Sequence, residues 1–95
     1  MTFDEFRASI ADDEPPADLN GYQRALWEDA RGNWAAAHEL VQDETTTEAA
    51  WIHAYLHRKE GDLANAGYWY RRCEMPVCED PLEVEWERIV RAILE

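Results

Sequence analysis

A repeat of 29 residues constrains the fold of this chain more than any other feature of its sequence. The two copies lie at about residues 20–43 and 46–74, with small, large and hinge residues in one register. The aligned pairs are Tyr22 with Trp51, Ala25 with Ala54, Trp27 with Leu56, Gly32 with Gly61, Asn33 with Asp62, Ala37 with Ala66, and Val41 with Tyr70. Similarity at a fixed period is typical of repeated supersecondary units, so the sequence predicts two copies of one helical hairpin.

Each predicted hairpin turns at a glycine followed by a capping residue, Gly32-Asn33 in the first copy and Gly61-Asp62 in the second. Glycine is favoured just past a helix end because it adopts a left-handed backbone without a Cβ clash. Asn and Asp are favoured before a helix because their side chains accept backbone amide protons. So short a connection makes the two helices of each copy run antiparallel. We therefore expect a positive φ at Gly61.

Capping patterns predict the other helix boundaries. Pairs that fit a capping box are Thr2 with Glu5, Asn20 with Gln23, and Thr45 with Glu48. The first pair predicts a short helix from Phe3 to Ile10, and the prolines of residues 15–16 end that segment. Asp80 followed by Pro81 predicts the start of a closing helix that continues to about Leu94. The residues expected to form its apolar stripe are Leu82, Trp86, Ile89, Val90 and Ile93. Its expected solvent-exposed face includes Glu83, Glu85 and Glu87.

The predicted architecture is all-α and forms a single domain over residues 1–95. It is a right-handed stack of two helix-turn-helix hairpins, with a short N-terminal helix before them and the closing helix 81–94 after them. Aromatic and aliphatic residues at helical spacing predict the core, including Leu40 in the first copy and Leu63 in the second. A terminal helix with one polar face is what a short helical stack needs to close its end.

The charge and composition exclude several functions. A net charge of −12 disfavours binding to nucleic acid or to an anionic membrane, because phosphate binding needs a basic surface. No apolar run is long enough to span a bilayer, and the N-terminus lacks a basic, apolar signal peptide. Cys73 and Cys78 are then expected to be reduced thiols, and the protein is expected to be cytoplasmic.

The repeat resembles the tetratricopeptide family, whose signature is a small residue in the first helix, a Gly-Asp-aromatic turn and Ala in the second helix. The matching residues are Ala25, Gly32-Asn33-Trp34 and Ala37 in the first copy, and Ala54, Gly61-Asp62-Leu63 and Ala66 in the second. The spacing of 29 departs from the 34 residues of the family. His53 and His57 also stand where the family usually has apolar or aromatic residues. The whole chain is similar to a group of small, uncharacterised bacterial proteins, and that resemblance implies no activity.

The resemblance implies that the exposed face of the first helix in each copy lines a concave groove. The implied lining is Tyr22, Leu26 and Asp29 in the first copy, and Trp51, Tyr55, Arg58 and Lys59 in the second. Residues 50–73 carry a net charge of +2 in this acidic chain, and such a basic patch attracts anions. The alternative is that Arg58 and Lys59 pair with neighbouring carboxylates such as Glu60 or Asp62.

We expect a non-enzymatic interaction module that recognises an acidic protein or peptide. The residues predicted to contact this partner are Trp51, His53, Tyr55, His57, Arg58, Lys59, Tyr68 and Arg71. The rival hypothesis is a small-molecule or enzymatic site around His53, His57, Arg58 and Arg71, with Asp62 and Tyr68 beside them. A shallow groove would favour the module, whereas a deep pocket holding both histidines and an arginine would favour the ligand site. The sequence does not specify an oligomeric state.

His53 and His57 are four residues apart, a spacing that can hold a metal between two imidazoles. Two ligands are too few, so His38, Cys73 or Cys78 would have to converge on them. We favour buried, hydrogen-bonded histidines and expect neither a metal nor a cofactor. The chain has no glycine-rich phosphate loop, and its one serine, Ser9, lies far from the histidines in sequence.

Overall fold

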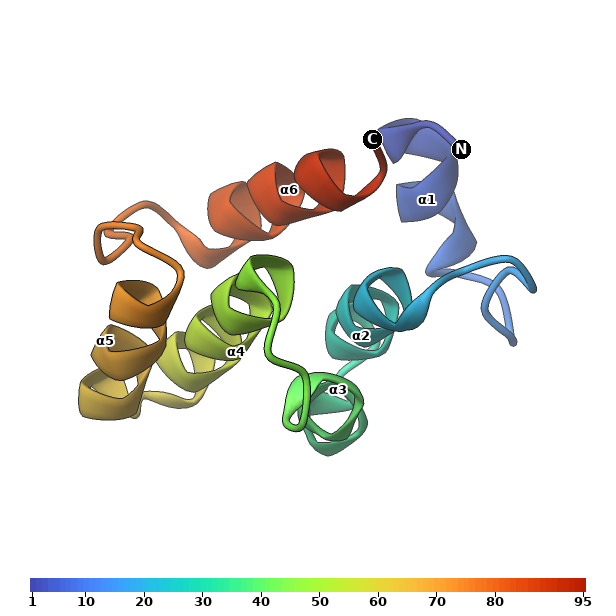
Figure 1. The fold of residues 1–95 in the computed structure, drawn as a ribbon. Coiled ribbons are helices and arrows are strands. Elements are labelled where there is room, and N and C mark those ends of the chain that lie inside the picture. The colour runs from blue at the N-terminus through green and yellow to red at the C-terminus, as the bar shows by residue number, and fades with distance from the viewer.

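The computed structural model describes all 95 residues and contains six α-helices and no strand, as the all-α prediction required (Figure 1). The helices are α1 (Phe3–Ser9), α2 (Gly21–Ala30), α3 (Trp34–Val41), α4 (Thr47–Glu60), α5 (Leu63–Arg72) and α6 (Leu82–Ile93). The strongest packing joins α2 to α3 and α4 to α5, which are the two predicted hairpins. None of the six helices combines the length and the apolar character that crossing a lipid bilayer requires.

Both hairpin turns contain the left-handed glycine that the sequence predicts. The φ angle is +84° at Gly32 and +91° at Gly61. The two turns differ at the next residue. The Asp62 carboxylate accepts the backbone N–H of Asn65 at 3.2 Å, whereas Asn33 makes no side-chain cap on α3. Glycine therefore sets the turn in both copies, and the cap contributes in the second copy only.

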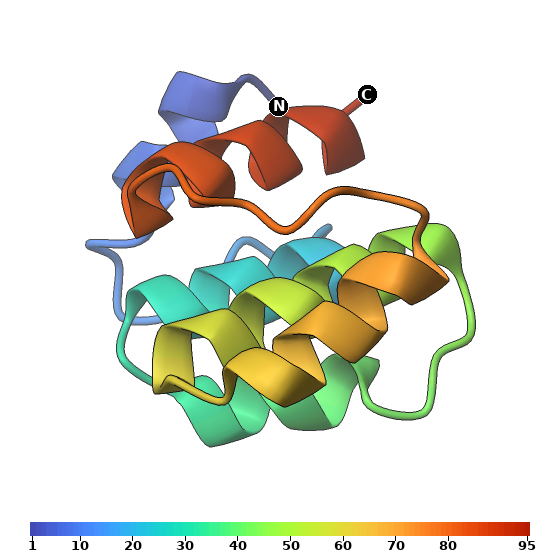
Figure 2. The same ribbon diagram turned by 90° about the vertical axis from the view of Figure 1, so that its left-hand side faces the viewer.

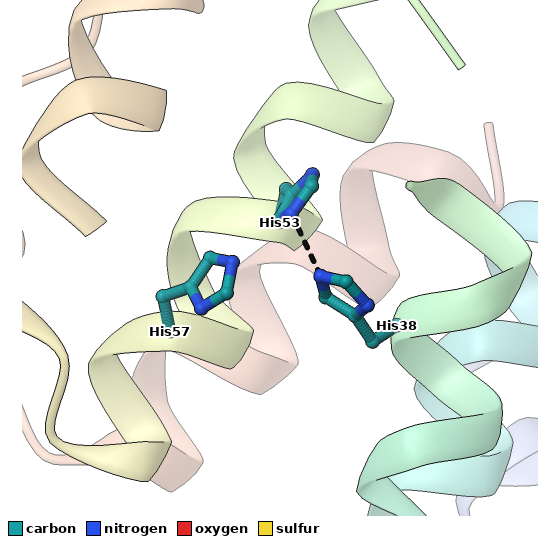
Figure 3. A group of neighbouring side chains, drawn as sticks. All are labelled: His38, His53 and His57. Carbon is teal, nitrogen blue, oxygen red and sulfur yellow. Dashed lines mark hydrogen bonds between the residues drawn. The ribbon is translucent and has the colours of Figure 1, made fainter. Parts of the chain in front are cut away.

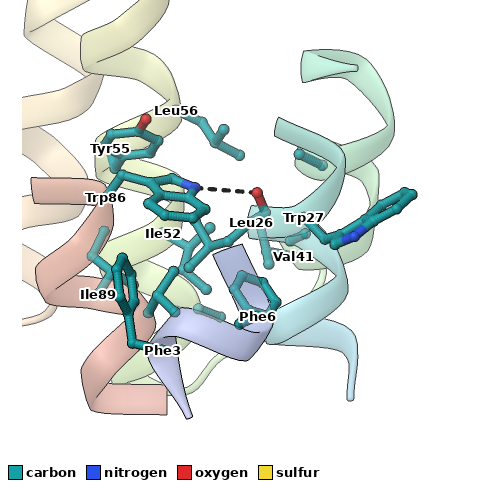
Figure 4. Packing of buried hydrophobic residues seen from close by; sticks show 14 residues of the cluster. Phe3, Phe6, Leu26, Trp27, Val41, Ile52, Tyr55, Leu56, Trp86 and Ile89 are labelled. Carbon is teal, nitrogen blue, oxygen red and sulfur yellow. Dashed lines mark hydrogen bonds between the residues drawn. The ribbon is translucent and has the colours of Figure 1, made fainter. Parts of the chain in front are cut away.

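The main core joins four helices, α1, α2, α4 and α6, with a contribution from α3 (Figure 4). Phe6, Leu26, Ile52 and Ile89 are fully buried in it. The Trp86 indole N–H donates to the carbonyl oxygen of Leu26 at 3.2 Å, so α6 is held to α2 by a hydrogen bond as well as by packing. A buried polar group that keeps its hydrogen bond avoids the desolvation cost of an unpaired one.

Helix α6 lies across α2 and α4, on the side opposite α3 (Figures 1 and 2). It covers the face that was expected to form an open groove. Leu26, Asp29 and Tyr55 are 0%, 1% and 2% exposed, so these predicted groove residues are interior residues. The chain's own apolar stripe on α6 fills that face, because Trp86, Ile89 and Val90 pack into the same core.

Glu85 is the clearest error in the predicted polar face of α6, because its side chain is 1% exposed. Arg58 donates to it at 2.9 Å, the Tyr70 hydroxyl at 2.7 Å and the Trp51 indole N–H at 3.2 Å. Periodicity alone assigns every glutamate to solvent. Here three donors from α4 and α5 converge on the carboxylate and offset the cost of burying it.

Two predicted caps and two predicted core residues are also wrong. Thr46, not Thr45, caps α4 by accepting the Ala49 N–H. Asp80 does not cap α6, since its carboxylate accepts from Arg88 at 3.0 Å. The side chains expected in the core but exposed are Leu40 at 38% and Leu63 at 69%. Both lie on the second helix of a hairpin, whose outer face no further helix covers.

Candidate functional site

All three histidines of the chain come together between α3 and α4 (Figure 3). His53 and His57 lie one turn apart on α4, and His38 reaches them from α3. The Nε2 atoms of His38 and His53 are 3.0 Å apart, and one ring nitrogen of each histidine lies within 4.8 Å of the other two. The first hairpin therefore supplies one imidazole and the second supplies two.

The cluster is shielded from solvent. His53 is 5% exposed and His57 is 6% exposed, while His38 is half-buried and forms the open side. Burial, together with the charges that His38 and His57 would carry, lowers the pKa of His53 to about 4. Burial, followed by His57, also lowers the pKa of His38. His38 and His53 are therefore neutral at pH 7, and each neutral ring keeps one lone pair on nitrogen.

Two tryptophans fix the orientation of the imidazoles. Trp69 of α5 stacks on His53, with ring centres 3.9 Å apart and planes at 13°. Trp34 of α3 stacks on His38 at 4.9 Å and 11°. The Trp34 indole N–H donates to the carbonyl oxygen of Leu56 at 2.7 Å, which anchors the stacked pair to α4. Side chains packed in this way lose little further freedom when the histidines bind a ligand.

Glu60 determines which nitrogen of His57 carries the proton. Its Oε1 lies 2.6 Å from His57 Nδ1, so Nδ1–H donates to the carboxylate and Nε2 keeps the lone pair. The Asn65 side-chain amide donates to this Nε2 at 3.3 Å. Asp62 lies near the same pair, because one atom each of His57, Glu60 and Asp62 that could ligate a metal lies within 4.8 Å of the other two. A carboxylate behind an imidazole is the usual outer support of a metal-binding histidine.

One histidine nitrogen is left without a partner. His53 Nδ1 is buried and makes no hydrogen bond. Most buried polar atoms in folded proteins are paired, and each exception calls for a physical reason. Nε2 of the same ring is shared with His38, so His53 has more bonding capacity than the chain satisfies. Its Nδ1 is therefore an unpaired donor or an unpaired acceptor, depending on which of the two rings donates at Nε2.

The predicted basic patch does not have free charges at its centre. Arg58 pairs with buried Glu85 at 2.9 Å and also donates to the Asp80 carbonyl. Lys59 pairs with buried Asp29 at 2.9 Å. The alternative of pairing with carboxylates is the one observed, although the partners come from α2 and α6 and not from the neighbouring turn. Arg58 is largely buried in its pair, whereas Lys59 stays exposed although its ammonium group is paired.

The structure places the eight predicted contact residues in three separate places. His53 and His57 belong to the histidine cluster, and Trp51, Tyr55, Arg58 and Lys59 belong to the packing around α6 and α2. Tyr68 and Arg71 lie exposed on α5. No cavity is lined by a histidine, so the predicted deep pocket holding both histidines and an arginine is not found. The buried thiol of Cys73 does not join the histidines either.

Sequence reasoning named His38 only as a residue that would have to converge, and it did not single out Trp34, Glu60 or Trp69 as part of the site. A usable signal exists for His38. Helices α3 and α4 are consecutive and packed together, and residues 42–46 connect them. Antiparallel neighbours of this kind bring residues on the two sides of a turn together, and His38 lies four positions before the connection and His53 seven positions after it. The Trp69 contact depends on the packing of α5 and has no comparable local signal.

Comparison of the chain with protein-family models, with curated proteins and with solved structures finds no match. The chemistry of the site follows from its own donor set. Three imidazoles, at least two of them neutral, face one another from two hairpins, with a carboxylate behind one ring. Neutral imidazole is a good ligand for zinc, copper and nickel ions.

Proposed function

We propose that this protein binds a divalent transition-metal ion, with zinc the reference case, through His38, His53 and His57. The observation that carries the proposal is the convergence of one nitrogen from each ring within 4.8 Å. Nitrogens around a tetrahedral zinc ion, at bonds of 2.0–2.1 Å, are about 3.3 Å apart. The His38–His53 pair is already at 3.0 Å, and the third nitrogen lies within 4.8 Å of both.

A metal ion would take the place of the one proton that His38 and His53 share between their Nε2 atoms. Two neutral imidazoles facing each other through Nε2 share one proton, and the Nε2 lone pair of the third ring accepts from the Asn65 amide at 3.3 Å, which an ion would displace. His53 Nδ1 has no hydrogen-bond partner in either tautomer, and an ion bound at Nε2 would leave it so. A bound cation would use one lone pair on each ring, and the net charge of −12 favours its approach.

Three protein ligands leave a fourth position for water or a further ligand. His38 is the half-buried member, so this position would face the open side of the cluster. The ion would also connect α3 to α4, and thus one hairpin to the other, because its ligands come from both. Metal binding of this kind adds directly to folding stability.

The test is a metal titration of protein without a histidine tag, in the presence of a weak competing chelator. We expect one equivalent of Zn²⁺, and with Co²⁺ the visible absorption of a four-coordinate ion. His38→Ala and His53→Ala should each remove the tight equivalent. The matched control is Cys73→Ala with Cys78→Ala, which removes the only thiols and should leave the stoichiometry at one. Zinc binding that persists in both histidine variants would falsify the proposal.

A second candidate function is the capture of an acidic protein or peptide, on a different surface from the predicted groove. The supporting observation is the outer face of α5, a helix whose backbone packs closely on α4 alone. Leu63 and Tyr68 are 69% and 45% exposed there, and neither Arg71 nor Arg72 is in any ion pair. The test is co-purification from cells at two salt concentrations, since exposed charges are screened by salt.

The tetratricopeptide-like stack and the cytoplasmic location belong to the same proposal. The antiparallel hairpins with glycine φ angles of +84° and +91° support the repeat. Because α6 lies across α2 and α4, the protein would be a closed form of such a stack, with its concave side filled. Cys73 and Cys78 are both free thiols, which supports a reducing compartment.

A further inference from the structure

A second group of potential metal ligands lies at the C-terminal end of α4. His57, Glu60 and Asp62 each place one ligand atom there within 4.8 Å of the other two. Glu60 Oε1 is 2.6 Å from His57 Nδ1, so Nδ1 is the ring nitrogen on this side. The left-handed backbone at Gly61 ends the helix and folds Asp62 back, since the Asp62 N–H donates to the His57 carbonyl at 2.9 Å. The turn therefore holds all three residues together.

The two carboxylates of this group are accessible and have oxygens to spare. Glu60 and Asp62 are both exposed, whereas His57 is 6% exposed and held within the helix packing. Glu60 Oε1 accepts from His57, and Asp62 Oδ1 accepts the N–H of Asn65 as the cap of α5. The second oxygen of each carboxylate has no hydrogen bond within the chain, and a carboxylate offers about four lone pairs in all. A ligand in solvent can reach both.

The local charge favours a cation. Neither Glu60 nor Asp62 pairs with a lysine or an arginine. The cations of the same turn, Arg58 and Lys59, are directed to buried carboxylates of other helices instead. The free carbonyl groups at the C-terminal end of a helix add to the negative potential. Two carboxylates and a helix end thus lie together without a balancing positive charge.

We propose that a second divalent metal ion binds here, with His57 Nδ1, Glu60 and Asp62 as its ligands. One imidazole nitrogen with two carboxylate oxygens is a ligand set that Zn²⁺ accepts. The inference rests on the proposed function, because His57 binds the first ion through Nε2 and the second through Nδ1. At bonds of 2.0–2.1 Å on either side of one ring, the two ions are about 6 Å apart.

The shared ring sets the order of binding. The second ion takes the place of the Nδ1 proton, which is released to solvent, and it approaches a ring that already holds a cation. It therefore binds more weakly than the first ion and fills its site afterwards. A weak chelator removes it, which leaves one tight equivalent at the three histidines.

The experiment is a calorimetric titration of metal-free protein without a histidine tag, using Zn²⁺ and no chelator. We expect a tight event followed by a weaker one. Asp62→Asn keeps a side-chain oxygen that can cap α5 but removes the charge. It should weaken the second event at least about tenfold and keep the first. The matched control is Asp43→Asn, an exposed residue outside both groups, which should keep both events. No second event, or one that Asp62→Asn leaves unchanged because the ion is adventitious, would overturn the proposal.

His38→Ala distinguishes this inference from the proposed function, because His38 belongs to the first group alone. The variant should lose the tight event and keep the one that depends on Asp62. A wild type with the tight event only would leave the three-histidine site standing and refute the second site. The opposite result, an Asp62-dependent event without a tight one, would refute the first site and support the second set of ligands.

Cu²⁺ tests whether the two ions share His57. Two Cu²⁺ ions joined by one imidazole couple magnetically, so the electron paramagnetic resonance signal of the first equivalent should fall as the second binds. In Asp62→Asn, the signal of the first equivalent should persist at the same concentration of copper. A signal that doubles in the wild type would show two separate ions and would contradict the shared ring.

Discussion

Helix α4 carries a polar cluster on each of two opposite sides, and the two clusters are in contrasting states. Toward α6, the buried Glu85 carboxylate receives donors from Arg58, Tyr70 and Trp51. Toward α3, three imidazoles face one another and one buried nitrogen has no partner. The first cluster is complete within the chain and the second is not. A buried polar cluster whose groups are all hydrogen-bonded has a structural role, whereas a cluster with an unpaired group indicates a missing partner.

The Glu85 cluster shows what completion means in this fold. Glu85 joins α6 to α4 through Arg58 and to α5 through the Tyr70 hydroxyl. Burial, then the hydrogen bond to Glu85, raises the pKa of Tyr70, so its hydroxyl stays a donor at all ordinary pH values. Both oxygens of the Glu85 carboxylate have donors within the chain, and the cluster holds α6 in place.

The largest expected effect comes from breaking the complete cluster. Glu85→Ala should lower the free energy of unfolding by about 3–5 kcal/mol, because it leaves Arg58 largely buried without its partner. Chemical denaturation measures the change, and the zinc stoichiometry of the folded fraction should stay at one. The matched control is Glu87→Ala on the same helix, where an exposed pair with Arg91 is worth about 0–1 kcal/mol. Equal losses in the two variants would contradict the distinction between the clusters.

Completing the histidine cluster should stabilise the protein from the other side of α4. Zinc at 100 times its dissociation constant should raise the free energy of unfolding by about 2.7 kcal/mol, because only the folded state presents all three ligands. The gain is measured by denaturation with and without zinc. His53→Ala should abolish it, and Glu87→Ala should keep it. A gain that survives His53→Ala would place the ion elsewhere.

The sequence predicts the helices and their hinges well because the signals are local. Gly32 and Gly61 have the positive φ angles that follow from a glycine after a helix. Capping boxes at Thr2 and Asn20 form as predicted. Asp62 also caps α5 as expected. Each of these depends on residues within four positions of one another.

The site is harder to predict because it depends on which helix covers which face. Periodicity predicts that Glu85 is exposed to solvent. In the fold, α6 directs its side chain toward Arg58, which is 27 positions away in sequence. The sequence around Lys59 indicates an unpaired cation, but in the fold it pairs with Asp29 of α2. His53 and His57 were identified from their spacing, but the third ligand, His38, comes from a different hairpin. Local periodicity carries no information on such contacts.

A smaller effect should come from Glu60, which supports the histidine cluster without being one of its three imidazoles. Glu60→Gln removes the negative charge that holds the Nδ1 proton of His57, and should weaken zinc binding by about 10–100-fold. Competition with a chelator of known affinity measures the loss. Glu48→Gln, at the other end of α4, is the matched control and should not change zinc affinity. Unchanged affinity in Glu60→Gln would mean that the ion does not bind through His57 Nε2.

The smallest expected effect on stability comes from cations that neither cluster uses. Arg71 and Arg72 are exposed on α5 and make no ion pair, unlike Arg58 and Lys59, which pair with buried carboxylates. Replacing both by Ser should therefore change the free energy of unfolding by less than about 0.5 kcal/mol. By contrast, reversing Arg58 and Lys59 to Glu should cost several times more, because Glu85 would then face a like charge in the interior.

The same arginine pair separates the two proposed surfaces. If α5 captures an acidic partner, Arg71→Ser with Arg72→Ser weakens co-purification while denaturation and zinc titration stay as in the wild type. A charge-matched control, Arg24→Ser with Arg91→Ser, removes two other exposed arginines and should leave capture intact. Equal loss of capture in both double variants would mean that overall charge, and not the α5 face, governs association. Unchanged capture in the α5 variant would remove that surface and leave metal binding as the function of the two hairpins.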